Sequence, residues 1–173
     1  EGVRQDPRTL NRVPPKQMAE TNMSYATPQN RVWDEAPAHS GRRAKEHPED
    51  AGIHYNLGLS LKQKDQLESA KKVFREALRL EPEMAKAYYT LGITCWQNGD
   101  IDESAAALRA AIARRPAYAE AHYMLGTALK QKGEWADAAK ALEEAIRLNP
   151  ASPGPFNTLA QIRQQQGDGE GAK

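Results

Sequence analysis

The sequence has little cysteine, few aromatic residues and no long apolar run. Its 173 residues include one cysteine, Cys95, which excludes an internal disulfide framework and any metal site built from several cysteines. No stretch approaches the 18 apolar residues that a membrane-spanning helix needs. The 24 basic and 23 acidic side chains leave a net charge of +1, which removes the usual electrostatic argument for a protein that binds nucleic acid. We therefore expect no nucleic-acid partner and no membrane span.

Proline is concentrated at the start of the chain, where six of the eleven prolines fall within the first fifty residues. Proline blocks helix interiors and pushes the residue before it toward extended geometry. We therefore predict an extended arm over residues 1–48, with one short helical turn near Arg31–Ala36. So long a segment without regular structure is unusual in a compact domain, so the arm is expected to lie on a surface or to be disordered. Its candidate contact residues are Trp33, Pro14 and Pro15.

From residue 51 onward the sequence repeats itself every 34 residues. The repeated columns are a Leu-Gly pair, an alanine and a proline: Leu57-Gly58, Leu91-Gly92 and Leu125-Gly126; Ala77, Ala111 and Ala145; Pro82, Pro116 and Pro150. Because four columns agree over three cycles, chance is a poor explanation. The pattern predicts a repeat domain over residues 49–173, with units at 51–84, 85–118 and 119–152 and a partial unit at 153–173.

Each unit has the pattern of two helices. In residues 119–132 the apolar side chains recur at intervals of three and four, as an amphipathic helix requires. A break follows at Asp65, Gly99 or Gly133, and the proline after the second helix stops it. One such pair cannot bury its apolar face alone, so neighbouring pairs must stack into a continuous core. The sequence therefore predicts an all-α solenoid.

The 34-residue pattern resembles the tetratricopeptide repeat. Besides the columns above, a small residue of the second helix is followed four residues later by a large one: Ala70 and Phe74, Ser104 and Leu108, Ala138 and Leu142. The resemblance covers residues 51–168 and implies a right-handed α-solenoid of three repeats plus a partial fourth. It also implies a non-enzymatic scaffold for protein–protein interaction. The repeats resemble those of bacterial members of the family. The family has many different partners, so the resemblance specifies no single one.

The resemblance implies that the first helices line a concave groove. The groove columns would then hold an aromatic ladder, a glutamine ladder and one tryptophan: Tyr55, Tyr89 and Tyr123; Gln63, Gln97, Gln131 and Gln165; and Trp96. Tyrosine offers a large rigid contact area, and glutamine both donates and accepts hydrogen bonds. An extended peptide is the expected ligand. Tyrosine is also common at this family position, so maintenance of the fold is the alternative explanation of that ladder.

Two groove functions known in the family do not fit. Members that grip the terminal carboxylates of chaperones use a lysine at the fifth position and an asparagine at the ninth position of the first repeat, where this sequence has Tyr55 and Leu59. An asparagine ladder at the sixth position is present only as Asn56. We therefore expect recognition by the tyrosine and glutamine columns.

The two ends of the solenoid depart from the pattern. Pro48 stands one period before Pro82, yet Ser40 and Arg43 occupy columns where a second helix needs core residues, so we expect the solenoid to begin near residue 49. At the other end Arg163 takes the core column that holds Cys95 in the second repeat. The partial fourth repeat is then either a cap or a repeat that continues beyond the sequence.

Few residues suggest chemistry. His54 and His122 share a column two repeats apart, so they cannot share an ion, and we interpret both as structural. Cys95 lies in a core column and is expected to be an inert buried thiol. We predict no catalytic residue, metal or cofactor. The triplet that begins at Asn22 fits the glycosylation acceptor pattern.

Three classes of function remain open. The first is an interaction scaffold with a protein or peptide segment in the groove. The second is a structural subunit that assembles head-to-tail into an oligomer or filament, with the arm on a neighbouring copy. An enzyme subunit is the third, and it requires a catalytic domain outside these residues. Because the sequence starts at Glu1 rather than Met, it is a processed chain or a fragment. This start favours a periplasmic or extracellular location after signal cleavage, with the cytoplasm as the alternative.

Overall fold

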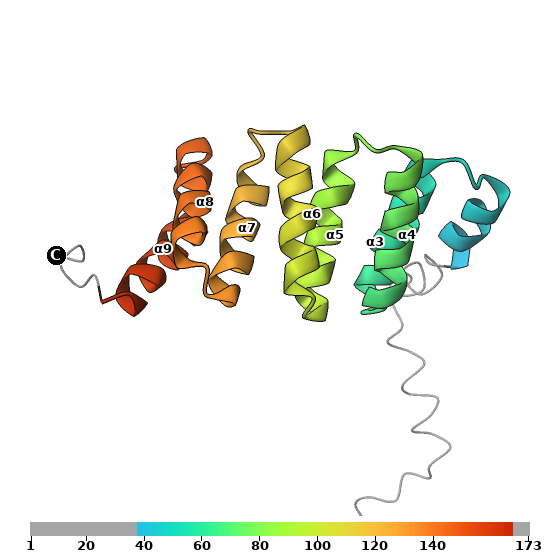
Figure 1. The fold of residues 1–173 in the computed structure, drawn as a ribbon. Coiled ribbons are helices and arrows are strands. Elements are labelled where there is room, and N and C mark those ends of the chain that lie inside the picture. The colour runs from blue at the N-terminus through green and yellow to red at the C-terminus, as the bar shows by residue number, and fades with distance from the viewer. Residues whose placement is uncertain (1–37, 168–173) are drawn as a thin grey trace, which may run out of the picture. The chain divides into compact units, whose positions relative to one another are not determined.

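The computed structural model describes residues 38–167, which belong to the second of the two units into which the chain divides, residues 37–173. The helices run in a single row (Figure 1): α3 Ala51–Gln63, α4 Leu67–Leu80, α5 Ala85–Asn98, α6 Ile101–Arg114, α7 Ala119–Lys132, α8 Trp135–Leu148 and α9 Pro153–Gln165. The described residues contain no strand. The fold is an all-α helical-repeat solenoid, and none of the helices within residues 38–167 combines the length and apolar character that crossing a membrane demands.

Consecutive helices pack in pairs, and the pairs stack. Helix α3 packs on α4, α5 on α6 and α7 on α8, while α4 contacts α5, α6 contacts α7 and α8 contacts α9. The first helices also reach one another directly, since α5 contacts α7 and α7 contacts α9. Comparable contacts are absent among α4, α6 and α8. The first helices therefore lie on the inner side of the curve.

The turn within each pair depends on a residue in the left-handed conformation. Gly99 and Gly133 have φ angles of 88° and 78°, and their amides donate to carbonyls of the preceding helix turn. Glycine adopts this conformation without cost. The equivalent residue of the first repeat is Asp65, with a φ of 59°. This turn reverses the chain so that the second helix packs antiparallel to the first.

The Leu-Gly column has a packing reason. A Cβ atom on Gly58 would lie 2.5 Å from Phe74 Cε1, and one on Gly126 would lie 2.6 Å from Leu142 Cγ. These large side chains of the second helices are fully buried. The glycine therefore leaves the space into which the large residue of the second helix packs. The glycine column and the column of large residues form one contact in each repeat.

The solenoid begins earlier than the sequence predicted. Residues 38–46 are helical, where we expected little regular structure. They stand one period before the last turns of α4, and Ala44 is 8% exposed. A Cβ on Gly41 would lie 4.0 Å from Leu57 Cδ1. The segment thus packs on α3 through small residues, and not through the large core residues that we required of a second helix. The predicted turn near Arg31–Ala36 lies outside the described residues, as do the other arm residues that we singled out: Trp33, Pro14, Pro15 and Asn22.

Candidate peptide-binding groove

One face of each first helix is only partly buried. In α7 this face consists of residues spaced by three and four, which lie on one side of a helix: Glu120, Tyr123, Thr127, Lys130 and Gln131. Glu120 and Gln131 are exposed, and the other three are half-buried. The opposite face is buried against the neighbouring helices: Ala121, Leu125, Ala128 and Leu129. We call the equivalent faces of α3, α5, α7 and α9 the groove face.

Tyr55 joins the first repeat to the second. Its ring lies 5.8 Å from the ring of Phe74, and its hydroxyl is 3.2 Å from the hydroxyl of Thr90 in the next repeat. Lys86 Nζ lies 4.9 Å from the centre of the ring. The tyrosine therefore fixes the register between two repeats and remains half-exposed on the groove face.

Tyr89 and Tyr123 have similar positions. The ring of Tyr89 lies 4.8 Å from that of Tyr118, and burial raises the pKa of Tyr89. A Cβ on Gly154 would lie 2.9 Å from Cζ of Tyr123, so the glycine leaves space for this ring. All three tyrosines of the ladder thus have a packing role against the following repeat. A ligand would contact the half of each ring that stays exposed.

The side chains of the glutamine column are exposed and free to bind a ligand. Its four members are exposed, and within residues 38–167 none of them makes a hydrogen bond to another residue: Gln63, Gln97, Gln131 and Gln165. Each amide therefore offers one acceptor and two donors along the groove face. These side chains contribute little to the fold, which distinguishes them from the tyrosines.

Trp96 is less available than its sequence position suggested. It is half-buried and packs against the core of the third repeat. Its indole Nε1 is buried and has no acceptor among the described residues. In the same column, Lys130 Nζ donates to Gln161 Oε1 at 2.6 Å. Part of the indole surface nevertheless stays on the groove face, between Lys62 and Lys130.

His54, His122 and Cys95 have structural contacts, as expected from their columns. Nε2 of His54 lies 2.9 Å from the carbonyl oxygen of Pro48, and His122 makes the same contact with Pro116. The thiol of Cys95 is fully buried, and burial raises its pKa to about 12. It therefore stays protonated near neutral pH. No group of three or more potential metal-binding side chains occurs in the part of the chain that the structure describes.

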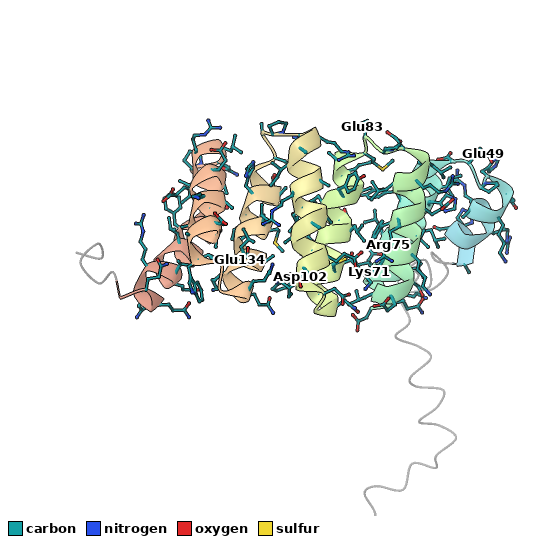
Figure 2. All side chains as sticks on the ribbon, in the orientation of Figure 1. Glu49, Lys71, Arg75, Glu83, Asp102 and Glu134 are labelled. Carbon is teal, nitrogen blue, oxygen red and sulfur yellow. The ribbon has the colours of Figure 1, made fainter. Side chains whose placement is uncertain are left out.

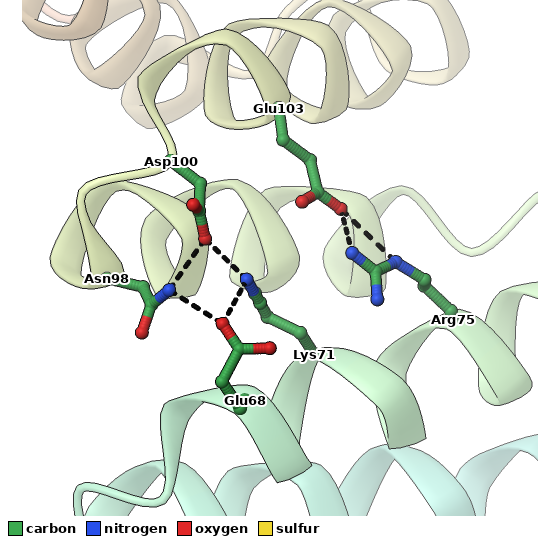
Figure 3. A network of polar contacts seen from close by, with 6 residues as sticks. All are labelled: Glu68, Lys71, Arg75, Asn98, Asp100 and Glu103. Atoms are coloured by element: carbon green, nitrogen blue, oxygen red, sulfur yellow. Dashed lines mark hydrogen bonds and ion pairs between the residues drawn. The ribbon is translucent and has the colours of Figure 1, made fainter.

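A polar network on the second helices was not anticipated from the sequence. Lys71 of α4 pairs with Asp100 at the start of α6 and with Glu68, and the side-chain amide of Asn98 bridges the same two carboxylates (Figure 3). Arg75 pairs with Glu103 beside it. Glu68 stands at the helical spacing of three from Lys71, but the contacts that join the two repeats connect residues about 30 positions apart, and no local spacing rule connects residues at that distance.

The contacts within the network favour the charged forms of its side chains. Only 5% of the Lys71 side chain is exposed. Hydrogen bonds to Asp100 and Glu68 raise the pKa of Lys71, and the hydrogen bond from Lys71 lowers the pKa of Asp100. Figure 2 places Lys71, Asp102 and Glu134 at the same end of the helix pairs, where first helices turn into second helices. Lys132 bridges Asp102 and Glu134 there. These contacts stabilise the stacking of repeats.

Models of the tetratricopeptide repeat family match residues 51–84 and 89–153. The chain belongs to the tetratricopeptide repeat family. The two matches cover more than half of the sequence and include the first and third repeats and most of the second. The chain is accordingly a protein-interaction scaffold of the helical-repeat type, and the family is typically non-enzymatic. No curated protein sequence matches the chain.

Solved structures of the same fold are similar over most of the chain. MamA 41-end from Desulfovibrio magneticus RS-1 is 23% identical with a TM-score of 0.78, and the alignment covers 92% of this chain and 90% of that one. Another MamA crystal structure is 24% identical with a TM-score of 0.75, over 87% and 85%. The first TPR of Spaghetti (RPAP3), bound to the HSP90 peptide SRMEEVD, is 16% identical with a TM-score of 0.67, over 68% and 94%. These likenesses concern the fold.

Proposed function

We propose that the chain is a non-enzymatic scaffold that binds an extended segment of a partner protein on the groove face. The observation that carries this proposal is the glutamine column: four exposed amides without hydrogen-bond partners among the described residues, on the inner side of the curve. Unpaired amides at one per repeat match the regular hydrogen-bonding groups of an extended backbone. A neighbour of the same fold is bound to a peptide, which supports a ligand of this class.

The tyrosines supply the second part of the recognition. Tyr55, Tyr89 and Tyr123 are partly buried by packing and each keeps part of its surface exposed. A ring already fixed by packing loses little conformational entropy when a ligand contacts it. The groove face therefore combines rigid aromatic surfaces with adaptable amides. We propose that the former bind apolar side chains of the partner and that the latter bind its backbone.

The glutamines provide the cleaner experiment, because their replacement leaves the core intact. Peptides selected on the full chain from a random twelve-residue display library are the probe. Gln63→Ala, Gln97→Ala and Gln131→Ala together should weaken their binding about tenfold, since two or three hydrogen bonds of about 0.5–1 kcal/mol are lost. The melting temperature should not change. The matched control replaces Lys72, Lys140 and Arg147 on the second helices with alanine. Equal loss in both variants, or no loss in the glutamine variant, rules out the groove.

Head-to-tail assembly is a second candidate, favoured by one observation at the end of the solenoid. Phe156 of α9 is 46% exposed, although large apolar side chains elsewhere in residues 38–167 are at least half-buried. A second copy that covered Phe156 would bury this ring. Sedimentation of the full chain from 1 to 500 μM tests the idea. Concentration-dependent growth that Phe156→Ser abolishes supports assembly, whereas a monomer throughout this range rules it out.

A further inference from the structure

Basic side chains of the repeats differ in their partners according to the face that carries them, since Lys132 at the end of the first helix α7 pairs with Asp102 and Glu134 as the second-helix cations pair with their carboxylates. On the second helices most have a carboxylate within 4.0 Å: Lys71, Arg75, Arg79, Arg109, Lys140 and Arg147. Lys72 is the exception on α4, since it has no partner among the described residues. These second-helix charges are therefore largely neutralised by the protein itself. They offer little attraction to a ligand of either sign.

The groove face carries three lysines, and none of them has a carboxylate partner within the described ranges. Lys86 lies over the ring of Tyr55, and Lys130 donates to the neutral amide of Gln161. Lys62 is half-buried, and no hydrogen bond or ion pair joins its ammonium group to a residue in 38–167. Glu120 is an acidic residue of the same face, and it is exposed and unpaired. The groove face is thus positive, although the whole chain is nearly neutral.

An unpaired lysine on a partly buried surface is a favourable site for a carboxylate. The attraction is stronger there than in bulk water, because the surrounding side chains lower the effective dielectric constant. No existing ion pair has to be broken first, and the contact of Lys130 with Gln161 is replaced by a stronger charge-assisted bond. The same ligand on the second helices would have to compete with Glu68, Glu76 or Glu144.

The column of Lys62, Trp96 and Lys130 also defines a spacing. These residues occur once per repeat at the same position of α3, α5 and α7. Helix α5 packs against α7 directly, whereas the backbone of α3 is joined to that of α5 through α4. With packed helices about 8–10 Å apart, an even spacing of the first helices would place the two lysines on the order of 20 Å apart. An extended peptide advances about 3.3 Å per residue. The two lysines therefore match acidic residues about six positions apart, with Trp96 facing the middle of the segment.

We propose that the partner segment of the groove is an extended acidic peptide, in which two carboxylates about six residues apart flank an apolar side chain. The carboxylates bind Lys62 and Lys130, and the apolar residue packs on Trp96. Lys86 adds a third positive site beside Tyr55. This inference rests on the proposed groove function and adds to it the charge and the spacing of the ligand.

Two parallel selections from the random twelve-residue library test the proposal. One uses the full chain, and the other uses the full chain with Lys62→Gln, Lys86→Gln and Lys130→Gln. Peptides enriched on the wild type should carry glutamate or aspartate about six positions apart around an apolar residue. The triple variant should lose that preference. The matched control is Lys72→Gln, Lys140→Gln and Arg147→Gln, which removes the same charge from second helices and should select the same acidic peptides as the wild type.

Single peptides then give the magnitude. The best acidic peptide should lose at least tenfold in affinity when its two acidic residues become glutamine and asparagine, and tenfold on the triple variant. Enriched peptides without acidic residues, whose binding needs the groove glutamines, would overturn the acidic preference and leave the groove function standing. A library that yields no groove-dependent peptide counts against both. If an oligothymidine of ten nucleotides binds more tightly than the acidic peptide, the surface recognises polyanions and the peptide assignment is wrong.

Discussion

First and second helices of this solenoid carry similar charged side chains but place them in different surroundings. On α4, lysine and arginine pair with carboxylates of the next repeat, as Lys71 and Arg75 do. On α3, α5 and α7, Lys62, Lys86 and Lys130 have no carboxylate partner within residues 38–167. The difference indicates a division of roles between faces: most cations of the repeats outside the groove face, Lys132 of α7 included, pair with carboxylates of the protein, and the three lysines of the groove face stay available for a ligand.

The largest effect on stability is expected at the contact between Gly92 of α5 and Leu108 of α6, where the two helices of a pair pack closely against each other. In Gly92→Ala the new Cβ would lie 2.7 Å from Leu108 Cγ and 3.3 Å from the Ser104 carbonyl oxygen. Overpacking of this kind costs about 1–3 kcal/mol, so the free energy of unfolding in urea should fall by about 2–3 kcal/mol. The control Ala106→Ser, on the exposed side of α6, should stay near the wild type. An unchanged midpoint for Gly92→Ala would show that the helix pair adjusts freely.

The second-largest effect is expected when a substitution breaks the polar network between repeats. Lys71→Met leaves Glu68 and Asp100 without their shared cation, and the lost charge-assisted hydrogen bonds should lower the free energy of unfolding by about 1–2 kcal/mol. The pKa values of both carboxyls are lowered by Lys71, so their contribution is present at neutral pH and disappears as pH falls below about 4. The difference between wild type and variant, measured by urea denaturation from pH 3 to 7, should therefore shrink with acid. A constant difference would mean that the loss is one of packing alone.

A smaller effect is expected at the turn between α3 and α4. Asp65 has a φ of 59°, whereas Gly99 and Gly133 occupy this column in the next repeats. Asp65→Gly should raise the free energy of unfolding by up to about 1 kcal/mol, because glycine adopts the left-handed region without strain. The matched variant Gly99→Asp should lower it by a similar amount, as its Cβ meets no atom within 4 Å and only backbone strain is added. Two changes of the same sign would contradict this explanation.

The smallest effect on stability is expected on the groove face. Lys62→Gln and Lys130→Gln break no ion pair, so together they should change the free energy of unfolding by less than about 0.5 kcal/mol. Lys71→Met on α4 is the comparison. Calorimetry of the Lys62→Gln, Lys130→Gln variant and of Lys71→Met, each against the wild type, measures the two changes in stability. A loss from the groove pair as large as that from Lys71→Met would remove the proposed division of roles.

Most of the fold could be predicted from the sequence, because the repeat makes each core position visible three times. Gly58 and Phe74 share one contact, and so do their equivalents, so the columns report packing directly. The helix at residues 38–46 was missed since its contacts use Gly41 and Ala44, which carry no hydrophobic pattern. Its only signal in the sequence was Pro48, which stands one repeat period before Pro82.

The candidate site was less predictable. The exposure of the glutamines followed from helical periodicity, but the packing of Tyr123 on Gly154 and the burial of the Trp96 indole nitrogen depend on the neighbouring repeat. The contact of Lys71 with Asp100 could not be predicted either, because side chains about 30 residues apart meet only after the repeats stack. Which cations are paired and which are free is therefore a property of the folded molecule.

NMR distinguishes binding on the groove face from binding elsewhere. The full chain, labelled with ¹⁵N, is titrated with a peptide selected from the library, and the shifts of backbone, glutamine amide and indole resonances are followed. If the ligand binds the groove face, the largest shifts occur at Gln63, Gln97 and Gln131 and at the indole of Trp96, with small changes on α4, α6 and α8. Shifts concentrated on the second helices, with the glutamine amides unchanged, would contradict binding on the groove face.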